Sequence, residues 1–265
     1  MRMLQFSANL GFLWADQSLA DGIRLAAKAG FDAVECHWPY NEPAAEVRSA
    51  LVDTGLEMLC INTSAGDVSV GEFGLSALPG RERQARNSID AAVEYAASIN
   101  AKNIHLMAGK VSQPDGHKVF ESNIVYACEQ AELAGCGILI EPINHHDVPG
   151  YFLNSTNLAR EILRRLDFQN LHMMFDCYHV AKMGLDIMTE FSESLSFIGH
   201  IQFAGLPDRG PPHNSSVDYM KIFSEIDHKG YANPVGAEYR PAGTTEESLV
   251  WLDRYKTSNS LLSKN

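Results

Sequence analysis

The sequence predicts an α/β protein folded as a single (β/α)8 barrel, also called a TIM barrel, over residues 1–265. Strand-like and helix-like segments alternate strictly from one end of the chain to the other, which is typical of this fold. The strand-like segments are apolar throughout, as in parallel strands that are covered on both faces. No linker rich in Pro, Gly or Ser divides the chain, so we expect one domain.

Eight short runs of apolar, mostly β-branched or aromatic residues are expected to be the strands. These runs are Leu4–Asn9, Ala33–Cys36, Leu56–Asn62, Asn103–Met107, Gly137–Glu141, Leu171–Asp176, Phe197–Gln202 and Pro234–Glu238. Between them, apolar residues recur at helical spacings of three and four. Examples are Leu19, Ile23 and Ala26 near the start, Ile89, Val93 and Ala96 in the middle, and Leu249, Leu252 and Tyr255 near the end. We therefore expect eight helices, with Gly30 and Gly230 as C-caps.

A doubly wound sheet is the alternative fold with the same alternation. Neither a G-x-G-x-x-G motif after the first strand nor a phosphate-binding P-loop is present, so we expect no nucleotide cofactor. Three long segments, Thr63–Gly80, Ala108–Lys118 and Phe203–Ser216, are expected to be loops. Loops of this length in a barrel usually cover an active site.

Charge and hydropathy exclude several classes of partner. With 21 basic and 33 acidic residues the net charge is −12, which would repel a nucleic-acid backbone. Apolar stretches such as Ile104–Met107 are far shorter than the roughly 20 residues that cross a bilayer, so we expect no membrane partner. The N-terminus lacks an apolar export segment, which predicts a cytoplasmic protein. A homo-oligomer is compatible with the sequence.

The five cysteines are scattered and include no Cys-x-x-Cys pair. A zinc knuckle or a dithiol redox site needs such a pair. We therefore expect reduced, mostly buried thiols.

Oxygen-bearing side chains close four consecutive predicted strands, namely Glu141, Asp176, Gln202 and Glu238. In a (β/α)8 barrel these positions meet at one mouth. Three carboxylates there would repel one another unless a cation neutralised them. An all-oxygen ligand set favours Mg²⁺ or Mn²⁺ over Zn²⁺. The alternative is that one or two of these acids cap helices or pair with nearby lysines.

A series of short motifs lies at the ends of the predicted strands. They are Phe-Ser-Ala-Asn-Leu at 6–10, Gly-Phe-Asp-Ala-Val-Glu at 30–35, Ile-Asn-Thr at 61–63, Leu-Pro-Gly-Arg at 78–81, His-Leu-Met-Ala-Gly at 105–109, Glu-Pro-Ile-Asn at 141–144, Phe-Asp-Cys-Tyr-His at 175–179, Gly-His-Ile-Gln at 199–202 and Gly-Ala-Glu-Tyr at 236–239. In this order they resemble the hydroxypyruvate isomerase family, within the wider xylose isomerase-like barrels, from Phe6 to Trp251. The resemblance implies that Glu141 and Glu238 are the acid and base pair and that the four residues at the strand ends hold the metal. It also implies a small 2-oxo acid as substrate, with hydroxypyruvate converted to 2-hydroxy-3-oxopropanoate through an enediolate.

Four further residues are expected to contact the substrate. His179 follows the sixth strand, and in related epimerases a histidine at this spacing reaches a substrate oxygen. Arg209 is the only arginine of the loop after the seventh strand, and its planar guanidinium suits a carboxylate. His105 and Glu35 close the fourth and second strands and point at the same mouth, although either could instead be a buried polar partner.

One loop departs from the family pattern, and three other functions stay open. Family members usually have Arg-Gly-Glu-Pro-Gly and then an acidic residue, whereas this chain keeps Arg209 but continues Gly-Pro-Pro-His. The substrate could therefore be a 2-oxo-tetronate or another short sugar acid. A phosphodiesterase like the endonuclease IV barrels is disfavoured, because those need a histidine-rich zinc cluster and a basic face. A barrel that binds a metabolite without converting it is disfavoured by the presence of both Glu141 and Glu238.

Overall fold

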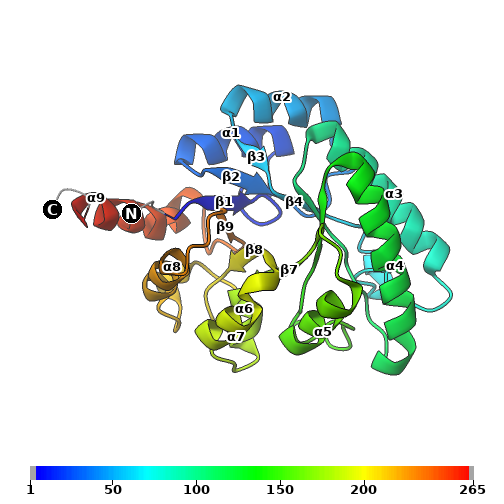
Figure 1. Ribbon diagram of the computed structural model, residues 1–265. Helices are drawn as coiled ribbons and strands as arrows, with labels where there is room; N and C mark the ends of the chain where they lie inside the picture. Colours follow the sequence, from blue (N-terminus) through cyan, green and yellow to red (C-terminus); the bar gives the residue numbers. More distant parts are fainter. Residues whose placement is uncertain (1–3, 263–265) are drawn as a thin grey trace.

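Parallel strands form the centre of the molecule in the computed structural model, which describes residues 4–262 (Figure 1). The strands are β1 Phe6–Asn9, β2 Ala33–Glu35, β3 Glu57–Met58, β4 Cys60–Asn62, β5 Asn103–His105, β6 Gly137–Ile140, β7 Leu171–Asp176, β8 Ile198–Phe203 and β9 Val235–Ala237. Each of the eight predicted runs contains strand residues, and their limits differ from the predicted ones by at most two residues.

The sheet closes on itself as an eight-stranded barrel. Its order is β3-β2-β1-β9-β8-β7-β6-β5-β4, and every pairing is parallel. Only Leu59 separates β3 from β4, and its backbone N–H donates to Val34 on β2. The two pieces are therefore one strand that pairs with β2 through its first half and with β5 through its second. The predicted fold class is confirmed.

Helices surround the barrel, with α1 and α2 above it, α3 and α4 to its right and α5 to α9 below and to its left in Figure 1. They are α1 Leu19–Ala29, α2 Ala44–Thr54, α3 Glu82–Ile99, α4 Gln113–Ala134, α5 Thr156–Leu166, α6 Cys177–Lys182, α7 Ile187–Ser194, α8 Tyr219–His228 and α9 Val250–Leu262. Short 3-10 turns lie at Val68–Val70, Leu195–Phe197, Pro212–Asn214 and Glu246–Leu249.

Two expectations about the crossovers were wrong. The second long loop ends at Ser112, because α4 begins at Gln113, where Pro114 in the first turn favours a helix start. The crossover after β7 contains two helices instead of one. Its α6 ends ahead of Gly184, which has a positive φ of 75°, and Asp186 then caps α7.

An aromatic cluster joins β1 and β8 to α8 and α9. The ring of Phe6 lies 5.0 Å from each of the rings of Phe223, Trp251 and Tyr255, and Phe203 lies 4.8 Å from Phe223. All five side chains are buried. The cluster thereby packs the first strand, β1, against the last helix, α9.

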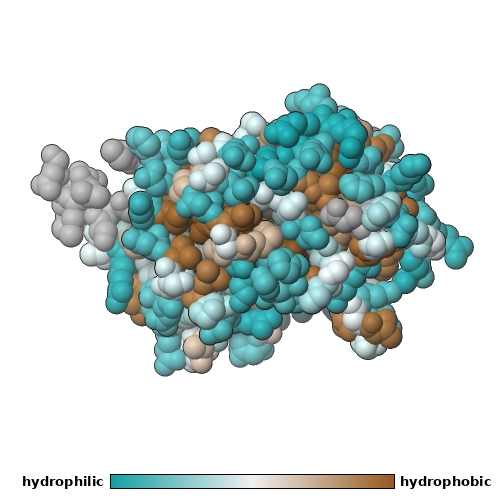
Figure 2. Space-filling model, turned by 90° about the horizontal axis from the view of Figure 1, so that it is seen from below, coloured by the Kyte–Doolittle hydropathy of each residue, from teal (hydrophilic) through white to brown (hydrophobic). Residues whose placement is uncertain are grey.

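The five cysteines are all free and buried, as predicted. Figure 2 shows a surface in which hydrophilic residues predominate, with smaller apolar patches among them. Among residues 4–262, no helix has the length and apolar content that crossing a membrane would require.

Candidate active site

A cavity of about 740 Å³ opens at the carboxyl ends of the strands. Its volume lies within the range of about 300–1,000 Å³ that small-molecule sites occupy. Five of the predicted site residues line it, namely His105, Glu141, His179, Arg209 and Glu238. Aromatic side chains of Phe12, Trp38, Phe73 and Tyr178 form much of the remaining wall.

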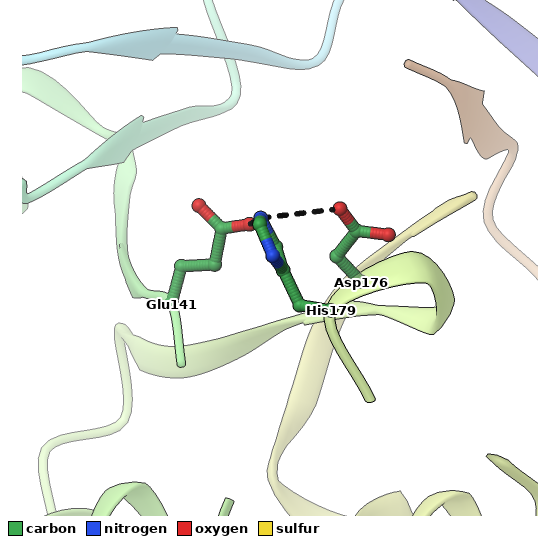
Figure 3. A group of neighbouring side chains, drawn as sticks. All are labelled: Glu141, Asp176 and His179. Carbon is green, nitrogen blue, oxygen red and sulfur yellow. Dashed lines mark ion pairs between the residues drawn. The ribbon is translucent and has the colours of Figure 1, made fainter. Parts of the chain in front are cut away.

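Glu141, Asp176 and His179 form the closest group of potential ligands in the described chain. One ligand atom of each lies within 4.8 Å of the others, and all three side chains are buried. Figure 3 shows the His179 ring between the two carboxylates. Its Nε2 lies 3.5 Å from Glu141 Oε1 and 3.6 Å from Asp176 Oδ2. The local fold accounts for this position, since the Asp176 side chain accepts from the backbone N–H of Tyr178 and caps the helix that carries His179.

Two buried oxygen atoms fit a bound cation. Glu141 Oε1 and Gln202 Oε1 have no hydrogen-bond partner in the structure. Buried oxygens without partners are costly, and an ion is one of the groups that can satisfy them. Gln202 Nε2 donates to Glu35 Oε1 over 2.8 Å, which leaves the amide oxygen free to act as a ligand. The residues therefore fit a divalent cation with oxygen ligands.

Glu35 lies inside the barrel and does not line the cavity, being 1% exposed. Asn9 and Gln202 donate to its Oε1, at 3.0 and 2.8 Å, while Ser7 and His200 contact its Oε2. Both carboxylate oxygens are therefore already bound by protein groups. This arrangement favours a role in holding Gln202 over the expected contact with substrate.

Arg209 and His37 contact the two carboxylate oxygens of Glu238. Arg209 donates to its Oε2 over 2.5 Å and also reaches Asp176 Oδ2 over 3.3 Å, while His37 Nε2 lies 2.9 Å from Glu238 Oε1. Burial raises the pKa of the Glu238 carboxyl, but Arg209 and His37 outweigh it and lower this pKa to about 2. Glu238 is therefore held in its ionised form.

The pKa values of the other two carboxyls of the site, Glu141 and Asp176, are shifted upward instead. Burial, together with the charges of Glu238 and Asp176, raises the pKa of Glu141 well above its usual value. Burial also raises the pKa of Asp176 to about 7, although Arg209 opposes the shift. A cation bound between these groups would remove the repulsion that raises both pKa values.

Burial favours the neutral form of His105 and His179. Burial lowers the pKa of His105 to about 4, and burial together with Arg209 lowers that of His179 to about 3. His105 Nδ1 lies 3.6 Å from Glu141 Oε2, and its buried Nε2 has no partner. Both rings can therefore serve as uncharged hydrogen-bond groups at the cavity.

The loop that follows β8 places Arg209 over the cavity. Gly205 and Gly210 exchange two backbone hydrogen bonds, and Arg240 donates to the Arg209 carbonyl over 2.8 Å. The guanidinium lies over the rings of Phe12 and Tyr178, 5.3 and 5.2 Å from their centres. Its position is thus fixed from several sides, with Nε buried and unpartnered.

Sequence reasoning missed several polar residues of the site, among them His37 and Asn144. His37, the partner of Glu238, lies two residues beyond β2, and the rule that reactive groups follow strands could have found it. Asn144 contacts His179 Nδ1 and lies in the Glu-Pro-Ile-Asn motif, where it drew no separate attention. The aromatic walls gave no signal, because aromatic residues are equally common in cores.

Residues 23–255 match the family described as "Xylose isomerase-like TIM barrel". The chain is 38% identical over 257 residues to a 2-oxo-tetronate isomerase of Cupriavidus necator, covering 96% of this chain and 99% of that protein. It is 34% identical over 258 residues to the hydroxypyruvate isomerase of Escherichia coli, covering 96% of this chain and 100% of that one.

Among solved structures, the chain resembles one named as an AP endonuclease of family 2 from Brucella melitensis. The TM-score is 0.91 and the identity 32%, over 96% of this chain and 99% of that one. A D-allulose 3-epimerase from Methylomonas sp. is similar in fold, with a TM-score of 0.74 at 16% identity, over 94% of this chain and 88% of that one.

Proposed function

Because this chain belongs to the xylose isomerase-like TIM barrel family, we propose that it is an isomerase that interconverts hydroxypyruvate and 2-hydroxy-3-oxopropanoate. The observation that carries the proposal is that the buried carboxylates Glu141, Asp176 and Glu238 lie close enough to act on one another's charge, with partnerless oxygens on Glu141 and Gln202. Relatives of matching length that are named as isomerases of short sugar acids support it.

Glu141, Asp176, Gln202 and Glu238 would hold a divalent cation, and their oxygen ligands favour Mg²⁺ or Mn²⁺. Glu238 would then exchange its contact with Arg209 or His37 for the cation. Such a cation would polarise the substrate carbonyl and stabilise the negative charge of the enediolate. The cation also explains why three carboxylates can share one buried site.

The two glutamates carry out the proton transfers. Glu238, which Arg209 and His37 hold in the ionised form, takes the proton from C3 of hydroxypyruvate. Glu141 returns a proton to C2. The hydroxyl proton on the C3 oxygen passes to the C2 oxygen, and exchange with solvent returns Glu238 to its ionised form and Glu141 to its protonated form before the next turnover. The isomerisation is therefore balanced and needs no redox cofactor.

The remaining polar groups bind and orient the substrate. Arg209 holds the carboxylate, which takes no part in proton transfer, through a pair of parallel hydrogen bonds. His179 and His105 lie beside Glu141 and contact the substrate oxygens. The aromatic walls exclude water from the reacting carbons.

A four-carbon 2-oxo-tetronate is the second candidate substrate. The cavity of about 740 Å³ has room for the additional carbon, and one of the relatives above is named as an isomerase of this acid. The chemistry at the carboxylates would be the same for both acids.

A phosphodiesterase activity, which the similar structure named as an AP endonuclease suggests, is less consistent with this chain. The net charge of −12 opposes DNA binding. The group of potential metal ligands found in residues 4–262, Glu141, Asp176 and His179, contains one histidine and two carboxylates, whereas a zinc cluster of that kind is rich in histidine.

The test is a panel of short 2-oxo acids, including hydroxypyruvate and 2-oxo-tetronate, assayed with Mg²⁺ and with Mn²⁺. We expect isomerisation of at least one of the two acids, detected as new aldehyde or ketone signals by NMR. A duplex with an abasic site is incubated under the same conditions. Cleavage of that duplex without conversion of any acid would contradict the proposal.

A further inference from the structure

The position of His179 between two carboxylates allows two different functions. Its Nε2 lies 3.5 Å from Glu141 and 3.6 Å from Asp176 and faces the cavity. A metal ligand at this position needs a lone pair on Nε2, whereas a hydrogen-bond donor needs a proton there. A neutral ring carries one proton, on either Nδ1 or Nε2. The hydrogen-bond partners of Nδ1 therefore determine whether Nε2 carries the proton or the lone pair.

Two donors of Asn144 face His179 Nδ1. The backbone N–H of Asn144 lies 3.3 Å away, and its side-chain Nδ2 lies 2.6 Å away. A peptide N–H can only donate, so Nδ1 must present its lone pair to it. A ring with no proton on Nδ1 is neutral and carries its proton on Nε2.

The orientation of the Asn144 amide is itself fixed by its neighbours. Its Oδ1 accepts from the backbone N–H groups of His146 and Asp147, at 3.1 and 2.9 Å. Its Nδ2 therefore points to the other side, where it also donates to Asp147 Oδ2 over 3.0 Å. Exchanging the two ends would place the amide oxygen against a carboxylate and the amide nitrogen against two N–H groups. The Asp147 carboxylate is held in turn by the Tyr178 hydroxyl at 2.8 Å.

We propose that Asn144 is a positioning residue that keeps His179 as a neutral imidazole with its proton on Nε2, so that His179 donates to a substrate oxygen and is not a metal ligand. The contact with substrate rests on the proposed function, whereas the tautomer and the exclusion from the metal do not. A fixed neutral donor stabilises negative charge that develops on a carbonyl oxygen without transferring a proton to it. The metal is then left to oxygen ligands alone, which is the set that Mg²⁺ and Mn²⁺ prefer.

The first experiment reads the tautomer directly. Long-range ¹H–¹⁵N correlation spectra of the ¹⁵N-labelled protein are recorded without substrate, and the His179→Gln variant assigns the ring signals. We expect an unprotonated Nδ1 and a protonated Nε2 in the wild type. A wild-type spectrum with the proton on Nδ1 would overturn the proposal.

Variants at Asn144 test its part in fixing the ring. Asn144→Asp replaces the Nδ2 donor, at 2.6 Å, with a carboxylate oxygen that accepts a hydrogen bond. This oxygen competes with the weaker backbone donor at 3.3 Å, and we expect a measurable share of the ring proton to move to Nδ1. The matched control Asn87→Asp, at an exposed position of α3, should leave the His179 signals unchanged. A folded Asn144→Asp protein with wild-type signals would show that Asn144 does not set the tautomer. If that variant does not fold, Asn144→Ala, which removes Nδ2 but keeps the backbone donor, should give mixed tautomers.

The second experiment measures Mn²⁺ binding by calorimetry, with no substrate present. His179→Gln should change the dissociation constant for Mn²⁺ by less than about threefold. Asp176→Asn should weaken Mn²⁺ binding by about 100-fold or more. Losing a residue that only contacts a metal ligand costs about 10- to 100-fold in metal affinity, and losing the ligand itself costs more. Equal losses for the two variants would make His179 a ligand and overturn the proposal. If both experiments give the expected results but no acid of the panel is isomerised, the proposed function fails while the assignment of the His179 proton stands.

Discussion

Glu141 and Glu238 lie in opposite electrostatic surroundings, which is how two similar side chains can serve as acid and base. Glu238 is paired with Arg209 and His37, whereas Glu141 Oε1 has no hydrogen-bond partner. We expect Glu141→Gln and Glu238→Gln each to lower kcat by at least about 100-fold, since general acid–base groups contribute that much or more. Circular dichroism checks the fold, and a well-folded variant with near-normal turnover would refute its assignment.

Exchange of the substrate C3 protons with D₂O separates the roles of the two glutamates. If Glu238 is the base, Glu238→Gln should abolish this exchange and Glu141→Gln should retain part of it. The reverse pattern would exchange the two roles.

Arg209 has two tasks in this account, since it pairs with Glu238 and Asp176 and also holds the substrate carboxylate. Lysine offers a point charge without the planar fork, so Arg209→Lys should lower kcat/KM for a 2-oxo acid by about 10- to 100-fold, or roughly 1.5–3 kcal/mol. An uncharged analogue that lacks the carboxylate should be affected much less. Equal losses for both substrates, measured side by side, would limit Arg209 to its contacts with the protein carboxylates.

Glu35 connects the barrel interior to the expected cation site through its hydrogen bond with Gln202. It accepts a hydrogen bond from Gln202 Nε2 and thereby directs the free oxygen of that amide. Glu35→Gln removes a charged acceptor, and we expect it to weaken Mn²⁺ binding by about 10- to 100-fold, as for other partners of metal ligands. Calorimetry on the folded variant measures this, and an unchanged affinity would mean that Gln202 is oriented by other contacts or is not a ligand.

At the residue scale, the sequence located the polar groups at the strand ends but not their pairings. Glu141, Asp176 and Glu238 follow from the position of reactive groups in barrels. The hydrogen bond between Glu35 and Gln202 joins residues 167 positions apart and depends on the closure of the sheet, which no local pattern encodes. The two-sided contact of Asn144 with His179 likewise depends on how two crossovers pack against each other.

At the scale of elements, periodicity predicted the strands well because they are buried on both faces. The limits of β7, Leu171–Asp176, match the prediction at both ends. The division of the crossover after β7 into α6 and α7 could not be read from periodicity, since α6 has only six residues and offers less than two full turns. That short helix is nevertheless what carries His179 into the site.

The aromatic cluster is the element-scale feature that packs α8 and α9 against β1 and β8. Phe223 on α8 contacts Phe6 and Phe203 and is 1% exposed. Phe223→Ala should lower the free energy of unfolding by about 3–5 kcal/mol, as for other buried phenylalanines. Urea denaturation measures this, and Met220→Ala on the same helix, where the side chain is 40% exposed, is the control. A change below about 1 kcal/mol for Phe223→Ala, well under the usual cost of such a truncation, would show that the cluster contributes little to the stability of the barrel.

At the scale of the whole molecule, fold class and reaction class were accessible from the sequence for different reasons. Strict alternation of strands and helices restricts the topology to few solutions, and the strand ends of a barrel restrict where chemistry occurs. Substrate choice depends on the long loops, and the loop at 204–218 departs after Arg209 from the pattern that the resemblance leads us to expect. The acidic protein surface, with its net charge of −12, is consistent with a small-molecule substrate.

The dependence of isomerisation on a divalent cation tests the central claim most directly. The protein is treated exhaustively with a chelator, elemental analysis verifies that the metal is gone, and the conversion rate of hydroxypyruvate and 2-oxo-tetronate is measured before and after adding Mg²⁺ or Mn²⁺. The buried carboxylates Glu141, Asp176 and Glu238 predict that activity is lost with the metal and returns with it. Full activity in the metal-free protein would contradict the account.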